Sequence, residues 1–147
     1  MSSSAYTSSL IPQSGLLTEP GRSAHYLEMN LKPDAGTVQI CAALDRARQT
    51  LADVYIAVAF GGEAWQRLQP AWQPAQLQPF KELRGENGYT MPATQRDVFF
   101  WIHGEDQGEV MNAVLQVHDA MRDVAVTLLD LNGFKNREAR DLTGFVD

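Results

Sequence analysis

Hydrophobic and polar positions alternate along residues 22–31, and this period of two is typical of a strand with one buried face. A turn follows at residues 32–36, after which apolar positions recur every three or four residues. This second pattern predicts an amphipathic helix that Thr37 caps. We expect its buried stripe to hold Val38, Cys41, Leu44, Ala47 and Leu51, which makes Cys41 a buried thiol.

The remaining patterns predict strands over residues 54–60, 98–103 and 125–131, a short helix over 63–68 and a long helix over 108–121. The expected buried stripe of the long helix is Val110, Val114, Val117 and Met121. The order strand, helix, strand, strand, helix, strand is that of the ferredoxin-like α+β fold, an antiparallel four-stranded sheet with two main helices on one face.

A proline-rich segment over residues 69–96 interrupts this order, and long insertions in small domains are often functional. We expect Trp72, Leu77 and Phe80 to anchor it. The predicted organisation is a flexible tail over 1–21, the ferredoxin-like domain over 22–132 and an interdomain loop over 133–147.

Composition excludes several classes of function but does not identify one. The net charge is −6, and the 12 basic residues do not cluster, so we expect no nucleic-acid partner. A single cysteine, no secretory signal and no apolar run of membrane-spanning length favour a cytoplasmic protein that does not enter the membrane.

The three histidines, His25, His103 and His118, are the candidate metal ligands. No two of them have the four-residue spacing of a helical metal site, so we predict no metal site and interpret each as a histidine at the border of the core. A small haem-binding α+β barrel with His118 or His103 on the iron stays open as an alternative.

The end of the chain carries the most specific motif. Residues 140–147, Arg-Asp-Leu-Thr-Gly-Phe-Val-Asp, closely resemble the run with which dye-decolourising (DyP-type) haem peroxidases enter their G-x-x-D-G motif. Gly144 matches the first glycine of that motif and Asp147 its aspartate. Weaker similarities lie upstream, in residues 13–17, in 58–61 with Trp65, and in 92–98.

This resemblance implies a haem b cofactor, hydrogen peroxide and a small reducing substrate such as a dye or phenol, and a homo-oligomeric assembly. It implies that Asp147 is catalytic and that Gly144 and Asp147 contact the haem. In this family a second ferredoxin-like domain supplies the haem-ligating histidine and a distal arginine. The resemblance therefore implies that neither residue is among the histidines and arginines of this chain.

We therefore expect a truncated N-terminal half of such a peroxidase, one half of its two-domain α+β barrel arrangement. The missing C-terminal domain would be its partner, and the isolated chain is expected to be inactive. Read beyond Asp147, the coding sequence should give a glycine next and a haem-ligating histidine further on. The remaining alternative is a ferredoxin-like interaction domain that dimerises through its exposed sheet face.

Overall fold

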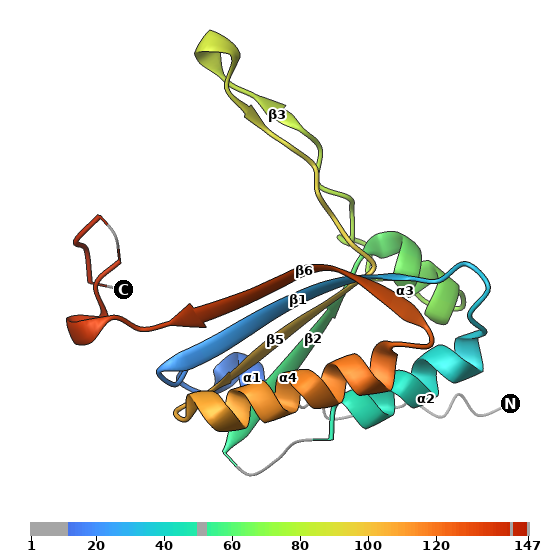
Figure 1. Cartoon of the computed structure of the whole chain (residues 1–147). Coiled ribbons are helices and arrows are strands. Elements are labelled where there is room, and N and C mark those ends of the chain that lie inside the picture. The colour runs from blue at the N-terminus through green and yellow to red at the C-terminus, as the bar shows by residue number, and fades with distance from the viewer. Residues whose placement is uncertain (1–11, 50–52, 142, 147) are drawn as a thin grey trace, which may run out of the picture.

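Two long helices cover one face of a four-stranded sheet in the computed structural model, which describes residues 12–49, 53–141 and 143–146 (Figure 1). The body consists of β1 (Ser23–Leu31), α2 (Thr37–Ala47), β2 (Val54–Phe60), β5 (Val98–Gly104), α4 (Gln107–Met121) and β6 (Ala125–Phe134). Shorter elements are α1 (Ser14–Leu17), α3 (Gly62–Leu68), β3 (Leu83–Arg84), η1 (Glu86–Gly88), β4 (Thr90–Met91) and η2 (Arg137–Ala139).

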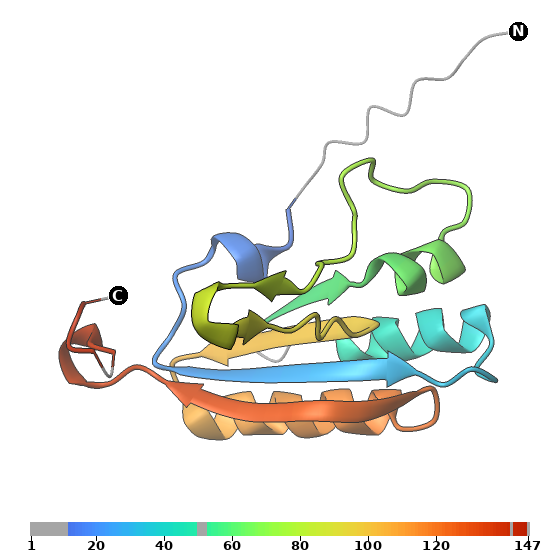
Figure 2. The same ribbon diagram turned by 90° about the horizontal axis from the view of Figure 1, so that it is seen from above.

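The strand order of the sheet is β2-β5-β1-β6, and every neighbouring pair is antiparallel (Figure 2). Each long helix connects two strands that are separated in the sheet by a third strand from the other half of the chain. This interleaving is the ferredoxin-like topology, so the predicted α+β fold is confirmed.

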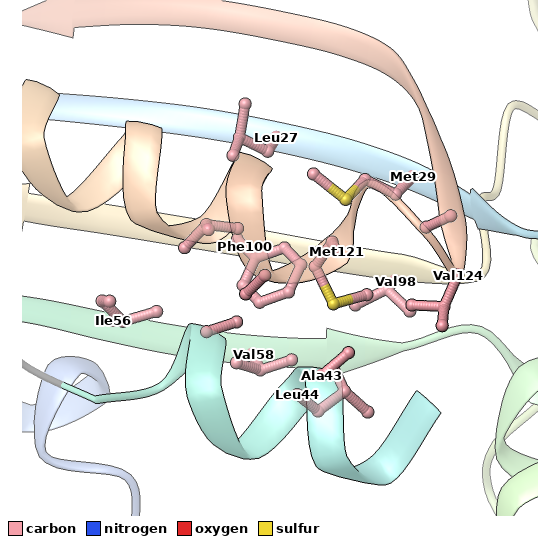
Figure 3. Packing of buried hydrophobic residues seen from close by; sticks show 14 of the residues in the cluster. Leu27, Met29, Ala43, Leu44, Ile56, Val58, Val98, Phe100, Met121 and Val124 are labelled. Atoms are coloured by element: carbon pink, nitrogen blue, oxygen red, sulfur yellow. The ribbon is translucent and has the colours of Figure 1, made fainter. Parts of the chain in front are cut away.

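The core lies between the sheet and the two long helices (Figure 3). Strand alternation directs Leu27 and Met29 of β1 and Phe100 of β5 into it, and all three are at most 1% exposed. The stripe predicted for α4 is confirmed, since Val110, Val114, Val117 and Met121 are buried.

The buried face of α2 agrees with the prediction at Leu44 and Ala47 and differs from it at Val38 and Cys41. Cys41 is exposed and Val38 is 83% exposed, whereas Ile40, Ala43, Leu44 and Ala47 are buried. Both sets have helical spacing, and the small alanine side chains let α2 approach the sheet and α4 closely. Gly36 occupies the N-cap position, so Thr37 is the first helical residue and not the cap. Leu51 lies outside the described residues.

The segment before β1 is also more structured than the expected tail. The Gln13 side chain accepts a hydrogen bond from the Val58 amide at 2.9 Å and donates one to the Val58 carbonyl at 2.8 Å. Its amide therefore pairs with the free edge of β2 as a neighbouring strand would. A Cβ on Gly15 would lie 3.3 Å from the Ala57 nitrogen, so glycine permits α1 to lie this close to β2.

Replacing Gln13 with alanine should therefore release the edge of β2 locally. Two hydrogen bonds are lost, so we expect the opening free energy at the Val58 amide to fall by about 1–2 kcal/mol. Native-state hydrogen exchange of that amide measures the change. The matched variant Gln107→Ala, at an exposed position in α4, should leave the exchange unaltered; equal exchange rates in the two variants would contradict the pairing.

The proline-rich segment leaves the body on the side opposite α2 and α4 and ends in the β3–β4 hairpin (Figure 1). Of the three residues expected to anchor this segment, Leu77 is half-buried, and Trp72 is 59% exposed but packs edge-to-face on Trp65 with ring centroids 5.7 Å apart, while Phe80 is 43% exposed. The indole N–H of Trp65 donates to the Trp72 carbonyl at 2.9 Å. Within the described residues, no helix is both long and apolar enough to cross a membrane.

Candidate functional site

Strand β6 continues beyond the edge of the helix layer and leads into the loop that carries the C-terminal motif (Figure 1). Asn136 starts this loop by accepting a hydrogen bond from the Arg137 amide at 2.7 Å. Glu138 and Ala139 follow with positive φ angles of 62° and 51°, which turn the chain sharply. The motif therefore stands at the end of the sheet, apart from the core.

Asp141 organises the motif loop. Its Oδ1 accepts hydrogen bonds from the Thr143 amide at 2.8 Å, the Thr143 hydroxyl at 2.6 Å and the Phe145 amide at 3.3 Å. This role was not predicted from the sequence, although aspartate side chains often accept a hydrogen bond from the backbone two residues further along the chain.

Gly144 lies at the apex of the same loop with a φ of +90°, a conformation that residues with a Cβ rarely adopt. No atom of the residues that the structure describes lies within 4 Å of the position a Cβ would take there, so the backbone conformation and not crowding favours glycine. The Gly144 carbonyl accepts a hydrogen bond from Arg140 at 2.8 Å, and Arg140 pairs with Val146 in an isolated antiparallel bridge. Asp147 itself lies outside the described residues.

The hydrogen bonds to Asp141, chiefly that from the Thr143 side chain, hold the pKa of its carboxyl below the ordinary value of 3.8. Because the pKa is lowered in the folded loop, ionised Asp141 stabilises the loop above the ordinary pKa. That contribution is lost as the pH falls through the lowered value.

We therefore expect the amide resonances of Thr143 and Phe145 to titrate together with a midpoint below 3.8. A pH series of amide NMR spectra measures this midpoint. A midpoint for Thr143 at or above the ordinary value would show that the loop bonds do not form.

Each of the three histidines has its Nε2 atom within hydrogen-bond distance of an oxygen of this chain. His103 is fully buried, its Nε2 lies 2.8 Å from the Gly15 carbonyl oxygen, and its ring packs against Tyr55 and Trp101. This contact fastens α1 to the sheet. His103 would have to give up the bond to Gly15 before this nitrogen could bind iron.

The other two histidines share one carboxylate. The Asp130 oxygens lie 2.5 Å from His25 Nε2 and 2.9 Å from His118 Nε2, which links β6 to β1 and to α4. The hydrogen bond from His25, followed by that from His118, lowers the pKa of Asp130 although partial burial acts in the opposite direction. Among the described residues no three histidine, cysteine or acidic side chains could hold a metal ion together.

Asp130→Ala should destabilise the chain, because Nε2 of the buried His25 loses its partner. We expect a loss of about 1–2 kcal/mol, since half the carboxylate is solvated and screening reduces its contribution. The lowered pKa means that this difference persists above about pH 4 and shrinks as the pH falls further. Urea unfolding at several pH values measures it, and exposed Asp123→Ala is the matched control. A pH-independent difference would rule out the ionised bridge.

The sheet face opposite the helices is largely open and aromatic. Tyr26 stacks on Phe99 with ring centroids 6.4 Å apart, and Trp101 lies beside Tyr26 in the neighbouring strand. Leu131, opposite Tyr26 in β6, is 51% exposed. An apolar face of this kind usually packs against another protein body.

Residues 13–135 match the family model of the N-terminal part of DyP-type peroxidases. A dye-decolorizing peroxidase of Mycobacterium tuberculosis is 35% identical over 92 residues, which are 63% of this chain and 27% of that protein. A similar enzyme of Rhodococcus erythropolis is 36% identical over 90 residues, which are 61% of this chain and 26% of that protein.

Solved structures agree over nearly the whole chain. An encapsulated DyP-type peroxidase from Mycobacterium smegmatis superposes with a TM-score of 0.80 and 26% identity, covering 92% of this chain and 46% of that one. A variant of DypB from Rhodococcus jostii in complex with haem gives 0.79 and 26%, covering 92% and 47%. The chain thus spans about half the length of these structures.

Proposed function

Because the chain belongs to the DyP-type peroxidase family, we propose that it forms the N-terminal half of a haem peroxidase that reduces hydrogen peroxide and oxidises dyes, phenols or other small reductants. The observation that carries the proposal is the match to the family's N-terminal part, followed directly by the motif loop over residues 140–147.

The described residues include side chains suited to contact one face of the porphyrin ring, but they offer no suitable ligand for the haem iron. The motif loop exposes Phe145 and Val146, 76% and 65% accessible, which suit contact with the apolar face of a flat macrocycle. The Nε2 atoms of all three histidines lie within hydrogen-bond distance of an oxygen of this chain, and the Nδ1 atoms of His25 and His103 are buried. We therefore infer that the iron ligand comes from outside this chain, and that Gly144 and Asp147 contact the haem.

Haem, when bound, supplies the iron at which peroxide is reduced. Asp147 would take a proton from one peroxide oxygen and return it to the leaving oxygen, as a positioned general base and acid. An aspartate has an ordinary pKa of about 3.9, so it is a poor proton acceptor unless its pocket raises that value, and we expect activity to favour mildly acidic conditions. The Asp141 hydrogen bonds and the Gly144 turn would position Asp147 by fixing the loop that precedes it.

The open sheet face supports a second body packed against this chain. We propose that this body is the C-terminal half of the peroxidase, which would also contribute the distal arginine. A homo-oligomer in the cytoplasm is the assembly we favour for the whole protein.

Haem binding tests the proposal directly. Titrating hemin into this chain should give no saturable Soret band of a histidine-ligated haem and no peroxide-dependent dye oxidation, whereas the product of the coding sequence read beyond Asp147 should give both. A natural stop codon directly after Asp147 would contradict the proposal. So would a Soret band in this chain that His103→Ala or His118→Ala removes, since it would favour a small haem-binding protein.

The exposed aromatic face favours one second candidate, an interaction domain that dimerises without haem. Sedimentation of this chain over a wide concentration range tests it. A single monomer species throughout would remove the candidate, whereas a dimer that Leu131→Ser disrupts would support it.

A further inference from the structure

A two-stranded hairpin extends from the body of the chain between α3 and β5. We call residues 81–91 the hairpin arm, which contains β3, η1 and β4. Leu83 pairs with Met91 and Arg84 with Thr90, and these two pairs form its ladder. An isolated two-stranded hairpin is at best marginally stable in water, so a ribbon of this kind needs support from another surface.

The two legs of the arm are joined at its base. Pro79 and Pro92 flank the arm in the sequence, and each restricts the backbone at its position. The side chain of Gln95 donates a hydrogen bond to the Phe80 carbonyl at 2.8 Å, which ties the returning leg to the outgoing one. These features give the arm a preferred direction.

One face of the arm is apolar. Leu83 and Met91 are direct partners, so their side chains lie on the same face of the ribbon, and strand alternation adds Tyr89 to it. Leu83 is 56%, Met91 60% and Tyr89 77% exposed, so most of this face is open to solvent. The opposite face carries Arg84 and Thr90 and is polar. Exposed apolar side chains gathered on one face are typical of a contact with another protein body.

The arm leans over the open face of the sheet. It leaves the end of the sheet where β5 begins, on the side opposite α2 and α4 (Figure 1). Figure 2 shows this face from above, with the arm in front of β2 and β5. The motif loop follows the end of β6, which the strand register places at the other end of the same sheet. A body that packs on the open face therefore meets the arm.

We propose that the hairpin arm packs against the C-terminal half of the peroxidase and that Leu83, Tyr89 and Met91 form the contact. This inference rests on the proposed function, which supplies that second half. The C-terminal half follows the motif loop in the chain, so the loop attaches it at one end of the open face and the arm holds it at the other. The contact itself involves no haem.

Trypsin tests the proposal, because Lys81 and Arg84 lie in the arm and the Arg84 side chain is 82% exposed. In this chain alone the hairpin opens easily, so cleavage at these two sites should be fast. In the product of the coding sequence read beyond Asp147 the arm is covered, and cleavage there should be slower by about tenfold or more. Mass spectrometry of the fragments over time measures the rate at each site.

A matched pair of variants in the longer protein tests which face makes the contact. Replacing Tyr89 and Met91 together by serine removes most of the apolar face, so cleavage at Arg84 should rise about tenfold, to its rate in this chain. Thr90→Ala, on the polar face, should leave the arm protected. The same serine variant of this chain alone should be cut at the unmodified rate, which excludes an effect of the substitutions on trypsin itself.

The proposal is wrong if the longer protein shows the Soret band of bound haem but is cut in the arm as fast as this chain, a result that leaves the proposed function intact. It is also wrong if Thr90→Ala exposes the arm as much as the serine variant does. Protection that disappears when the protein is diluted to monomers would assign the contact to a second copy and overturn the proposal.

A longer protein with a protected arm and no bound haem would contradict the proposed function and support the arm contact. A natural stop codon directly after Asp147 would overturn both.

Discussion

Replacing Phe100 with alanine should lower the free energy of unfolding of this chain by about 3–5 kcal/mol, the range for deletion of a large buried aromatic side chain. Phe100 is fully buried in β5, where its direct partners are Leu27 in β1 and Val58 in β2 (Figure 3). Removing the ring opens a cavity in the layer between the sheet and the two helices. Urea unfolding followed by circular dichroism measures the loss.

Phe134→Ala is the matched control, because this phenylalanine is 74% exposed at the end of β6. The same atoms are deleted there without a core cavity, so we expect a change of about 0.5 kcal/mol or less. Similar losses for the two variants would mean that the core does not lie where the strand register places it.

Asp147→Asn in the full-length, haem-loaded protein should slow the reaction with hydrogen peroxide by about 10²–10⁴-fold, the contribution of a positioned general acid–base group. Asparagine keeps the shape of the side chain and removes its ability to accept and return a proton. Stopped-flow spectroscopy of the Soret band after mixing with peroxide measures the rate.

The Soret band before mixing should be unchanged, which separates a lost proton carrier from lost haem. Asp123→Asn, an exposed change far along the chain from the motif, should react at the unmodified rate. An Asp147→Asn variant with full activity would exclude the proposed role of Asp147 and leave the family membership untouched.

Local alternation predicted β1 and its buried face correctly, because this strand buries every second side chain. The alternation that ends in Leu27, Met29 and Leu31 allows only one register of buried side chains, and a slip by one residue would expose all of them. The motif over residues 140–147 could also be recognised in the sequence, because its residues are consecutive. The role of Asp141 within it was missed, although its partners lie two and four residues away.

The face of α2 could not be predicted in the same way. Its sequence offers two stripes with helical spacing, one through Val38 and Cys41 and the other through Ile40 and Ala43. Hydrophobicity alone favours neither of them. The choice depends on how closely the backbone must approach α4 and the sheet, and that distance is a property of the packed structure.

The sequence by itself determined the order of the elements, the buried faces of β1 and α4, and the resemblance of residues 140–147 to a haem peroxidase motif. These features depend on periodicity and on neighbours in the chain. Only the tertiary structure decided that Asp130 bridges His25 and His118 and that Gln13 pairs with the edge of β2. Each of these contacts joins residues far apart in sequence, and the strand order that brings them together leaves no periodic signal along the chain.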